Sequence, residues 1–123
     1  MTEPMITILV VEDETLIRMA IVDNLEHAGF RVVEAANATD AVLLLVADPQ
    51  IRAMFTDIDM PGGVDGLKLA IAVRRRWPPI HIIVTSGQVH MRQADMPVEG
   101  LFFAKPYDAG NIASAFRTML AAA

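Results

Sequence analysis

The chain has 123 residues, a formal net charge of -5 and no cysteine. Its length suits one domain with a single core, residues 1–123, and the absence of cysteine excludes disulfides, thiol catalysis and thiolate metal sites. The negative charge argues against non-specific binding to nucleic acid, which clustered lysine and arginine side chains supply. No segment resembles a targeting signal or a bilayer-spanning run, so we expect a cytoplasmic protein with no membrane contact.

Five short runs of apolar and β-branched residues predict strands that are buried on both faces of a parallel sheet. In chain order they are residues 6–11, 30–35, 51–56, 80–84 and 101–104. Apolar side chains at helical spacing predict helices over residues 15–28, 38–47, 65–77 and 108–122. Residues 87–100 contain Pro97 and few apolar positions, so only a short or irregular helix is expected there.

The alternation of strands and helices predicts the fold. Gly29 after the first helix, and Pro78 with Pro79 after the third, supply the stop signals. Right-handed crossovers with helices on both faces then give an α/β fold, a doubly wound, five-stranded parallel sheet. The flavodoxin-like strand order 2-1-3-4-5 is the natural choice.

Chemically active side chains stand where four of the predicted strands end. Glu12 and Asp13 follow the first strand, Asp57 the third, Thr85 the fourth and Lys105 the fifth. The carboxyl ends of parallel strands border the functional crevice, and the first and third strands are neighbours in the predicted order, so the three acids should share one pocket. Close carboxylates repel each other, and bound Mg²⁺ is the economical explanation for their grouping.

Asp57 is the candidate nucleophile, because a carboxylate beside Mg²⁺ can attack phosphorus and form an acyl phosphate. The hydroxyl of Thr85 and the ammonium of Lys105 would stabilise the charge on the transferring group. Each residue taken alone also has a simpler interpretation. Asp13 could cap the helix that begins at Thr15, and Thr85 and Lys105 could be ordinary strand-end residues. Their joint placement favours a site for a phosphoryl group.

Ordered motifs over essentially the whole chain resemble the response-regulator receiver family, in its single-domain, chemotaxis-type form. They are the pair Glu12-Asp13 in Val-Val-Glu-Asp, Asp57 in Thr-Asp-Ile-Asp-Met-Pro, Thr85 in Val-Thr-Ser-Gly, and Lys105-Pro106. The resemblance implies that Asp57 is the phosphoacceptor of a two-component phosphorelay. It also implies Mg²⁺ held by Asp13, Asp57 and the backbone carbonyl of Asp59, with Glu12 acting through a coordinated water.

The same resemblance implies that Lys105 grips the phosphoryl group and that its bond to Pro106 is cis. Thr85 would turn toward the phosphoryl group and Phe102 would fill the vacated space, while Phe103 should point to the opposite face. A partner would then recognise a changed surface around the fourth helix, the fifth strand and the fifth helix. The other residues expected near the site are Ser86, Gly87, Met60 and Pro106.

The resemblance also implies the partners. The phosphoryl donor would be a histidine kinase or a phosphotransfer protein, and the reader a downstream protein that the sequence does not identify. No output domain and no direct contact with nucleic acid are expected, and a homodimer is left open. The protein would assist only its own phosphorylation and dephosphorylation, so it is expected to be a signalling switch and not an enzyme.

Two departures from the common receiver pattern flank the site. The loop between Pro61 and Asp65 is longer by about one residue, and the segment between Thr85 and Lys105 is shorter by about two. Together with Pro97, these departures predict an altered surface at the fourth helix.

Two other functions compete with the switch. A small haloacid-dehalogenase-like phosphatase would use Asp57 as its nucleophile in the motif Asp57-Ile58-Asp59. In that family, however, the nucleophile follows the first strand, whereas here an acidic pair precedes Asp57 and no cap insertion is present. The third candidate is a phosphorylation-independent scaffold on the same fold. The arginines at residues 74–76 are expected to be solvated at a helix C-terminus.

Overall fold

The computed structural model describes residues 5–60, 66–87 and 92–121. These residues form a five-stranded parallel sheet with the order β2-β1-β3-β4-β5. The strands are β1 (Thr7–Val11), β2 (Arg31–Ala35), β3 (Ile51–Asp57), β4 (His81–Ser86) and β5 (Leu101–Ala104). The helices are α1 (Thr15–His27), α2 (Ala38–Ala47), α3 (Gly66–Arg76), α4 (Ala109–Ala121) and a short 3₁₀ helix, η1 (Gln93–Asp95).

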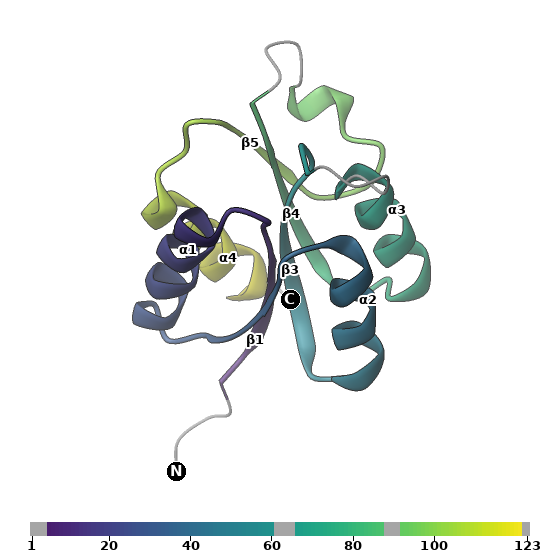
Figure 1. Cartoon of the computed structure of the whole chain (residues 1–123), viewed down its shortest axis with the longest axis horizontal. Helices are drawn as coiled ribbons and strands as arrows, with labels where there is room; N and C mark the ends of the chain where they lie inside the picture. Colours follow the sequence, from purple (N-terminus) through teal and green to yellow (C-terminus); the bar gives the residue numbers. More distant parts are fainter. Residues whose placement is uncertain (1–4, 61–65, 88–91, 122–123) are drawn as a thin grey trace.

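The helices cover both faces of the sheet, with α1 and α4 on one face and α2 and α3 on the other (Figure 1). The predicted doubly wound fold and its strand order are therefore confirmed. None of the helices in the described ranges combines the length and hydrophobicity that crossing a bilayer requires.

The strands alternate their side chains between two hydrophobic clusters, one on each face of the sheet. Leu9 and Val11 of β1 belong to the cluster beneath α2 and α3, whereas Ile8 and Val10 belong to the cluster beneath α1 and α4. All four side chains are fully buried. A central strand that is covered on both faces needs apolar residues at every position, which explains the continuous apolar run.

Two strands extend further than the sequence predicted. β3 includes Asp57, and β4 includes Thr85 and Ser86, because the ladder between the two strands continues through the pair Asp57↔Thr85. These residues are consequently held by backbone pairing and do not lie on loops.

The helix boundaries follow local signals. Gly29 has a φ of +99°, the left-handed conformation that its predicted role as the stop after α1 requires. Asn37 caps α2, since its side-chain oxygen accepts a 2.8 Å hydrogen bond from the backbone N–H of Asp40. The N-cap of α1 is Glu14, so the simpler interpretation of Asp13 as the cap of that helix is wrong.

The segment before β5 is irregular, as its sequence predicts. Its described part, residues 92–100, contains only the three-residue helix η1, so the helix expected fifth in the chain is α4. The longer loop inferred between Pro61 and Asp65 lies outside the described residues.

Arg74 departs from the predicted solvated arginine run. Its guanidinium donates hydrogen bonds to the backbone carbonyls of Pro78 at 2.6 Å, Ile80 at 2.8 Å and Glu99 at 2.7 Å. The chain turns back after α3, so carbonyl groups that need donors surround this side chain. Arg76 instead stacks on the Trp77 ring, with its guanidinium carbon 4.7 Å from the ring centroid.

We predict that Arg74→Lys lowers the free energy of unfolding by about 2 kcal/mol, because a lysine ammonium cannot satisfy the same three carbonyls with a planar fork of donors. Denaturant unfolding followed by circular dichroism measures the change. Arg75 is exposed on the same helix turn, so Arg75→Lys is the matched control. Equal stability of both variants would show that the carbonyl contacts of Arg74 contribute nothing.

Candidate functional site

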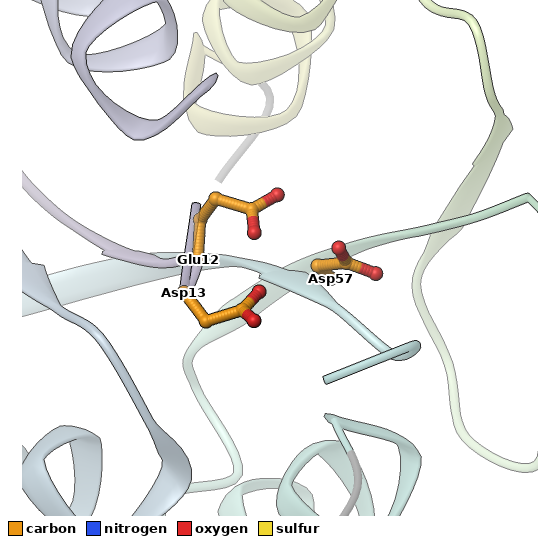
Figure 2. Close-up of side chains that lie close together, drawn as sticks. All are labelled: Glu12, Asp13 and Asp57. Atoms are coloured by element: carbon orange, nitrogen blue, oxygen red, sulfur yellow. The ribbon is translucent and has the colours of Figure 1, made fainter. Parts of the chain in front are cut away.

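Three carboxylates meet where β1 and β3 end. The pair Val11↔Thr56 brings the last residue of β1 beside the penultimate residue of β3, so Glu12 and Asp13 follow directly next to Asp57. One carboxylate oxygen from each acid lies within 4.8 Å of the others. Figure 2 shows the side chains of Glu12 and Asp13 extending from the end of β1 toward Asp57. The predicted grouping of the three acids is present.

The acids differ in their exposure to solvent. Glu12 is 0% and Asp57 3% exposed, whereas Asp13 is exposed. Glu12 accepts a 3.1 Å hydrogen bond from the backbone N–H of Glu14 through Oε2, while Oε1 is buried without a protein partner. Arg18 of α1 donates to the backbone carbonyl of Glu12 at 2.7 Å and so fixes the end of β1 against this helix.

The environment of Glu12 favours its neutral form. Burial raises the pKa of Glu12 to about 8; the hydrogen bond from the Glu14 N–H opposes the shift, and the nearby Asp13 and Asp57 reinforce it.

Lys105 supplies positive charge to Asp57. Its Nζ atom lies 2.6 Å from Asp57 Oδ2, and the backbone N–H of Asp59 donates to Asp57 Oδ1 at 2.8 Å. Burial disfavours the charged form of Lys105, but the hydrogen bond to Asp57 and the charges of Asp57, Glu12 and Asp59 outweigh it and raise the pKa of Lys105. The ammonium is therefore held at Asp57 as a permanent cation at neutral pH. The peptide bond between Lys105 and Pro106 is cis, as the resemblance implies.

The side chain of Asp59 is a second carboxylate near Lys105. Its carboxylate accepts hydrogen bonds from the hydroxyl of Ser86, at 2.9 Å and 3.2 Å, and from the backbone N–H of Gly87 at 2.7 Å. It also approaches Lys105 Nζ to 3.8 Å. These contacts join the end of β4 to the loop after β3, and they bring Ser86 and Gly87 to the site as expected.

Thr85 is fully buried at the site and bonded to the edge strand. Asp57 and Thr85 are paired in register, and the Thr85 hydroxyl donates to the backbone carbonyl of Phe103 at 2.7 Å. Phe102 packs half-buried against the α2 and α3 cluster, and Phe103 packs against the opposite cluster, so their predicted opposition is confirmed. Met60 is buried within the cluster that Phe102 contacts.

Two residues near the acids escaped the sequence analysis. Tyr107 is packed edge-on against Phe55, with ring centroids 5.6 Å apart, and its hydroxyl is buried without a protein partner. Burial raises the pKa of Tyr107 to about 12, and the charges of Glu12 and Asp57 add to the shift. Gly66 lies so close to the Asp57 carbonyl that a Cβ there would clash with it. The position of Tyr107 directly after Lys105-Pro106 was the available signal, whereas nothing local marked Gly66.

Comparison with known proteins gives the family. The sequence model of the response regulator receiver domain matches residues 8–117. The chain belongs to the response regulator receiver family. Receiver domains are signalling switches of two-component systems that interact with histidine kinases or phosphotransfer proteins and bind Mg²⁺ at an acidic pocket.

A similar relative is the putative response regulator NtrX-like of Rickettsia felis, which is 37% identical over 81 residues, or 65% of this chain. The chain spans only 17% of that protein's length. Among solved structures, a response regulator receiver protein from Sinorhizobium medicae superposes with a TM-score of 0.86 at 26% identity and covers 96% of both chains. TrrA from Thermotoga maritima, solved in complex with Mg²⁺ and BeF, has the same fold, with a TM-score of 0.82, 24% identity, and 94% and 99% coverage.

The acids fit a divalent cation. Their hard oxygen ligands are those that Mg²⁺ prefers, and Glu12, one of the three acids, has a buried Oε1 atom without a protein partner. A bound cation would also relieve the repulsion among three carboxylates.

The raised pKa of Glu12 predicts a pH-dependent stability in the absence of divalent cations. The folded state holds a proton on Glu12 up to about pH 8, whereas the unfolded chain releases it near pH 4.5, so the folded state binds more protons in between. The stabilising contribution is complete below pH 4.5 and is lost as the pH rises toward 8. We expect the difference in unfolding free energy between the wild type and Glu12→Gln to change by roughly 4 kcal/mol over this range.

Chemical denaturation of both proteins in EDTA, from pH 5 to pH 8.5, measures this difference. Glu12→Gln keeps the shape of the side chain and cannot titrate, so background titrations cancel. Parallel stability profiles for the two proteins would contradict the predicted titration of Glu12.

Proposed function

We propose that this chain is the phosphoacceptor switch of a two-component phosphorelay, with Asp57 receiving the phosphoryl group from a phosphohistidine. The observation that carries the proposal is the 2.6 Å contact between Lys105 Nζ and Asp57 Oδ2, together with the grouping of Asp57 with the acids Glu12 and Asp13. A nucleophilic carboxylate thus has both an ammonium and a candidate divalent-cation site beside it. This is the charge arrangement that phosphoryl transfer requires.

In the proposed reaction, a carboxylate oxygen of Asp57 attacks the phosphorus of the phosphohistidine. The new O–P bond forms as the N–P bond breaks. The electron pair of the N–P bond stays on the imidazole nitrogen, which takes up a proton from solvent. Lys105 stabilises the charge on the phosphoryl oxygens, and the backbone N–H of Asp59 orients the Asp57 carboxylate. Hydrolysis of the acyl phosphate by water would return Asp57 and release phosphate. The protein would promote these reactions only on itself and would not be an enzyme.

Mg²⁺, when bound, would neutralise the acids and the phosphoryl oxygens. We assign its ligands to the carboxylates of Asp13 and Asp57 and the backbone carbonyl of Asp59, with Glu12 contacting it through a coordinated water. The exposure of Asp13 supports direct ligation, because an exposed carboxylate stays charged at low cost. Glu12, being buried and prone to hold a proton, suits the outer role.

The switch would begin at Thr85. Its hydroxyl is bonded to the Phe103 carbonyl, and turning toward a phosphoryl group on Asp57 would break this bond. Phe102, which is half-buried on β5, would move into the space that Thr85 leaves. The surface formed by η1, β5 and α4 would change and be recognised by a downstream protein.

The partners belong to the same proposal. A histidine kinase or a phosphotransfer protein would donate the phosphoryl group in the cytoplasm, and a separate protein or a further domain would read the output. A net charge of -5 disfavours direct contact with nucleic acid.

Incubation with Mg²⁺ and acetyl phosphate tests the proposal. Intact-mass spectrometry should show one added phosphoryl group on the wild type and none on Asp57→Asn, which retains the shape of the side chain. EDTA should abolish the adduct. The absence of an adduct would overturn the proposal, and repeated turnover of phosphomonoesters would favour a phosphatase.

Thr85→Val, which removes the hydroxyl and nearly conserves volume, should slow phosphorylation by acetyl phosphate about tenfold or more, because one donor to the phosphoryl oxygens is lost. It should also leave the β5 backbone unresponsive to phosphorylation, since the Thr85 hydroxyl links Asp57 to Phe103. Rates from intact mass and amide chemical shifts of β5 measure the two effects. Thr85→Ser, which keeps the hydroxyl, is the control; equal rates in all three proteins would contradict the assigned role.

A further inference from the structure

The side-chain amide of Gln93 occupies the free edge of the sheet. Its Nε2 atom donates to the backbone carbonyl of Gly100, and its Oε1 atom accepts from the backbone N–H of Phe102, both at 2.8 Å. Among the described residues, β5 is an edge strand that pairs with β4 alone, from Ile83↔Leu101 to Ser86↔Ala104. The Gly100 carbonyl and the Phe102 N–H are therefore bonded to Gln93 on the side of β5 away from β4. The Gln93 amide takes the place of one residue of a neighbouring strand.

The segment around Gln93 has its own anchors. The backbone N–H of Arg92 donates to the Asp95 carboxylate at 2.9 Å, which caps the η1 turn that begins at Gln93. At the other end of the segment, the Glu99 carbonyl accepts from Arg74 at 2.7 Å. Residues 92–99 are thus a short unit that Gln93 attaches to β5.

Between these anchors, Met96 and Val98 pack against the same hydrophobic cluster as Phe102. Gly100 lies so close to β4 that a Cβ there would approach the Ile82 carbonyl oxygen to 2.7 Å. The η1 unit and Phe102 therefore share one hydrophobic cluster in addition to the Gln93 hydrogen bond.

Adjacent residues of β5 are held from opposite sides. Thr85 holds the Phe103 carbonyl from the β4 side, at 2.7 Å, and Gln93 holds the Phe102 N–H from the outer side. The Thr85 hydroxyl and the η1 unit are consequently both bonded to the dipeptide Phe102-Phe103. A movement of this dipeptide displaces the acceptor of one bond and the donor of the other.

We propose that Gln93 is a positioning residue that couples β5 at Phe102 to the η1 unit, residues 92–99. Because of this coupling, the unit moves together with β5 when Asp57 is phosphorylated. The attachment itself stands on the hydrogen bonds alone, whereas its use during switching rests on the proposed phosphorylation of Asp57. Through this coupling, the segment before β5 can change its position on phosphorylation although its described part contains no regular α-helix.

Hydrogen exchange of the unmodified protein, followed by NMR, tests the attachment. Gln93→Ala should speed exchange of the Phe102 amide about fivefold or more, because the Gln93 oxygen that accepts its hydrogen bond is removed, while the Leu101 and Phe103 amides stay within about twofold. Gln93→Glu keeps an acceptor and should retain most of the protection at Phe102. Gln50→Ala, an exposed glutamine elsewhere, is the matched control. An unchanged Phe102 exchange rate in Gln93→Ala would overturn the attachment.

Addition of Mg²⁺ and beryllofluoride, a phosphoryl mimic, tests the coupling. The wild type should show amide shift changes in β5 and in residues 92–99. Gln93→Ala should bind the mimic with an affinity within about threefold of the wild type and keep the change at Phe103, but lose at least half of the change in residues 92–99. The quantity compared is the ratio of the shift change in residues 92–99 to the shift change at Phe103. If Gln93 had a purely structural role, this ratio would be the same in Gln93→Ala and in the wild type.

Two results would overturn the coupling: an unchanged ratio in Gln93→Ala, or no response of residues 92–99 in the wild type. Failure of the wild type to bind the mimic and to accept phosphate from acetyl phosphate would overturn the proposed function, and with it the coupling to phosphorylation. The exchange measurement would still decide the attachment.

Discussion

Repulsion among three carboxylates is the constraint on which the rest of the site depends. Oxygens of Glu12, Asp13 and Asp57 lie within 4.8 Å of one another, and Lys105 is the ammonium held at Asp57, 2.6 Å away. Burial, reinforced by the neighbouring Asp13 and Asp57, favours the protonated form of Glu12, whereas the side chain of Asp13 is exposed to water. A phosphoryl group would add further negative charge, which is why the proposed function requires Mg²⁺ as well as Lys105.

The parallel sheet fixes this arrangement. Register pairs place Asp57 beside Thr85, and Ser86 beside Ala104, the residue before Lys105. The functional groups are therefore held at the ends of hydrogen-bonded ladders over a fully buried core. Within this frame, the hydrogen bond from Thr85 to the Phe103 carbonyl is made by a side chain and is not one of the backbone bonds of the ladder. The proposed switch breaks this bond, and Gln93 carries its effect beyond the sheet.

The sequence predicted the sheet order and the grouping of the acids, because apolar runs and the residues that end them are local signals. It did not predict the environment of Glu12, since the path of the chain into α1 decides which acid is buried. The sequence did not predict the hydrogen bonds of Arg74 and Gln93 for a related reason. Their partners are backbone groups from four to twenty-five residues away, which only the folded chain brings together. Gly66 was missed because its close approach to Asp57 is tertiary.

The central claim is that a covalent phosphoryl bond forms at Asp57. Borohydride reduces an acyl phosphate to an alcohol, so reduction after treatment with Mg²⁺ and acetyl phosphate, followed by peptide mass mapping, locates the bond directly. The account predicts conversion of the Asp57 side chain to a primary alcohol, dependent on both Mg²⁺ and acetyl phosphate. Reduction at another residue, or no reduced residue in a sample with complete peptide coverage, would contradict it.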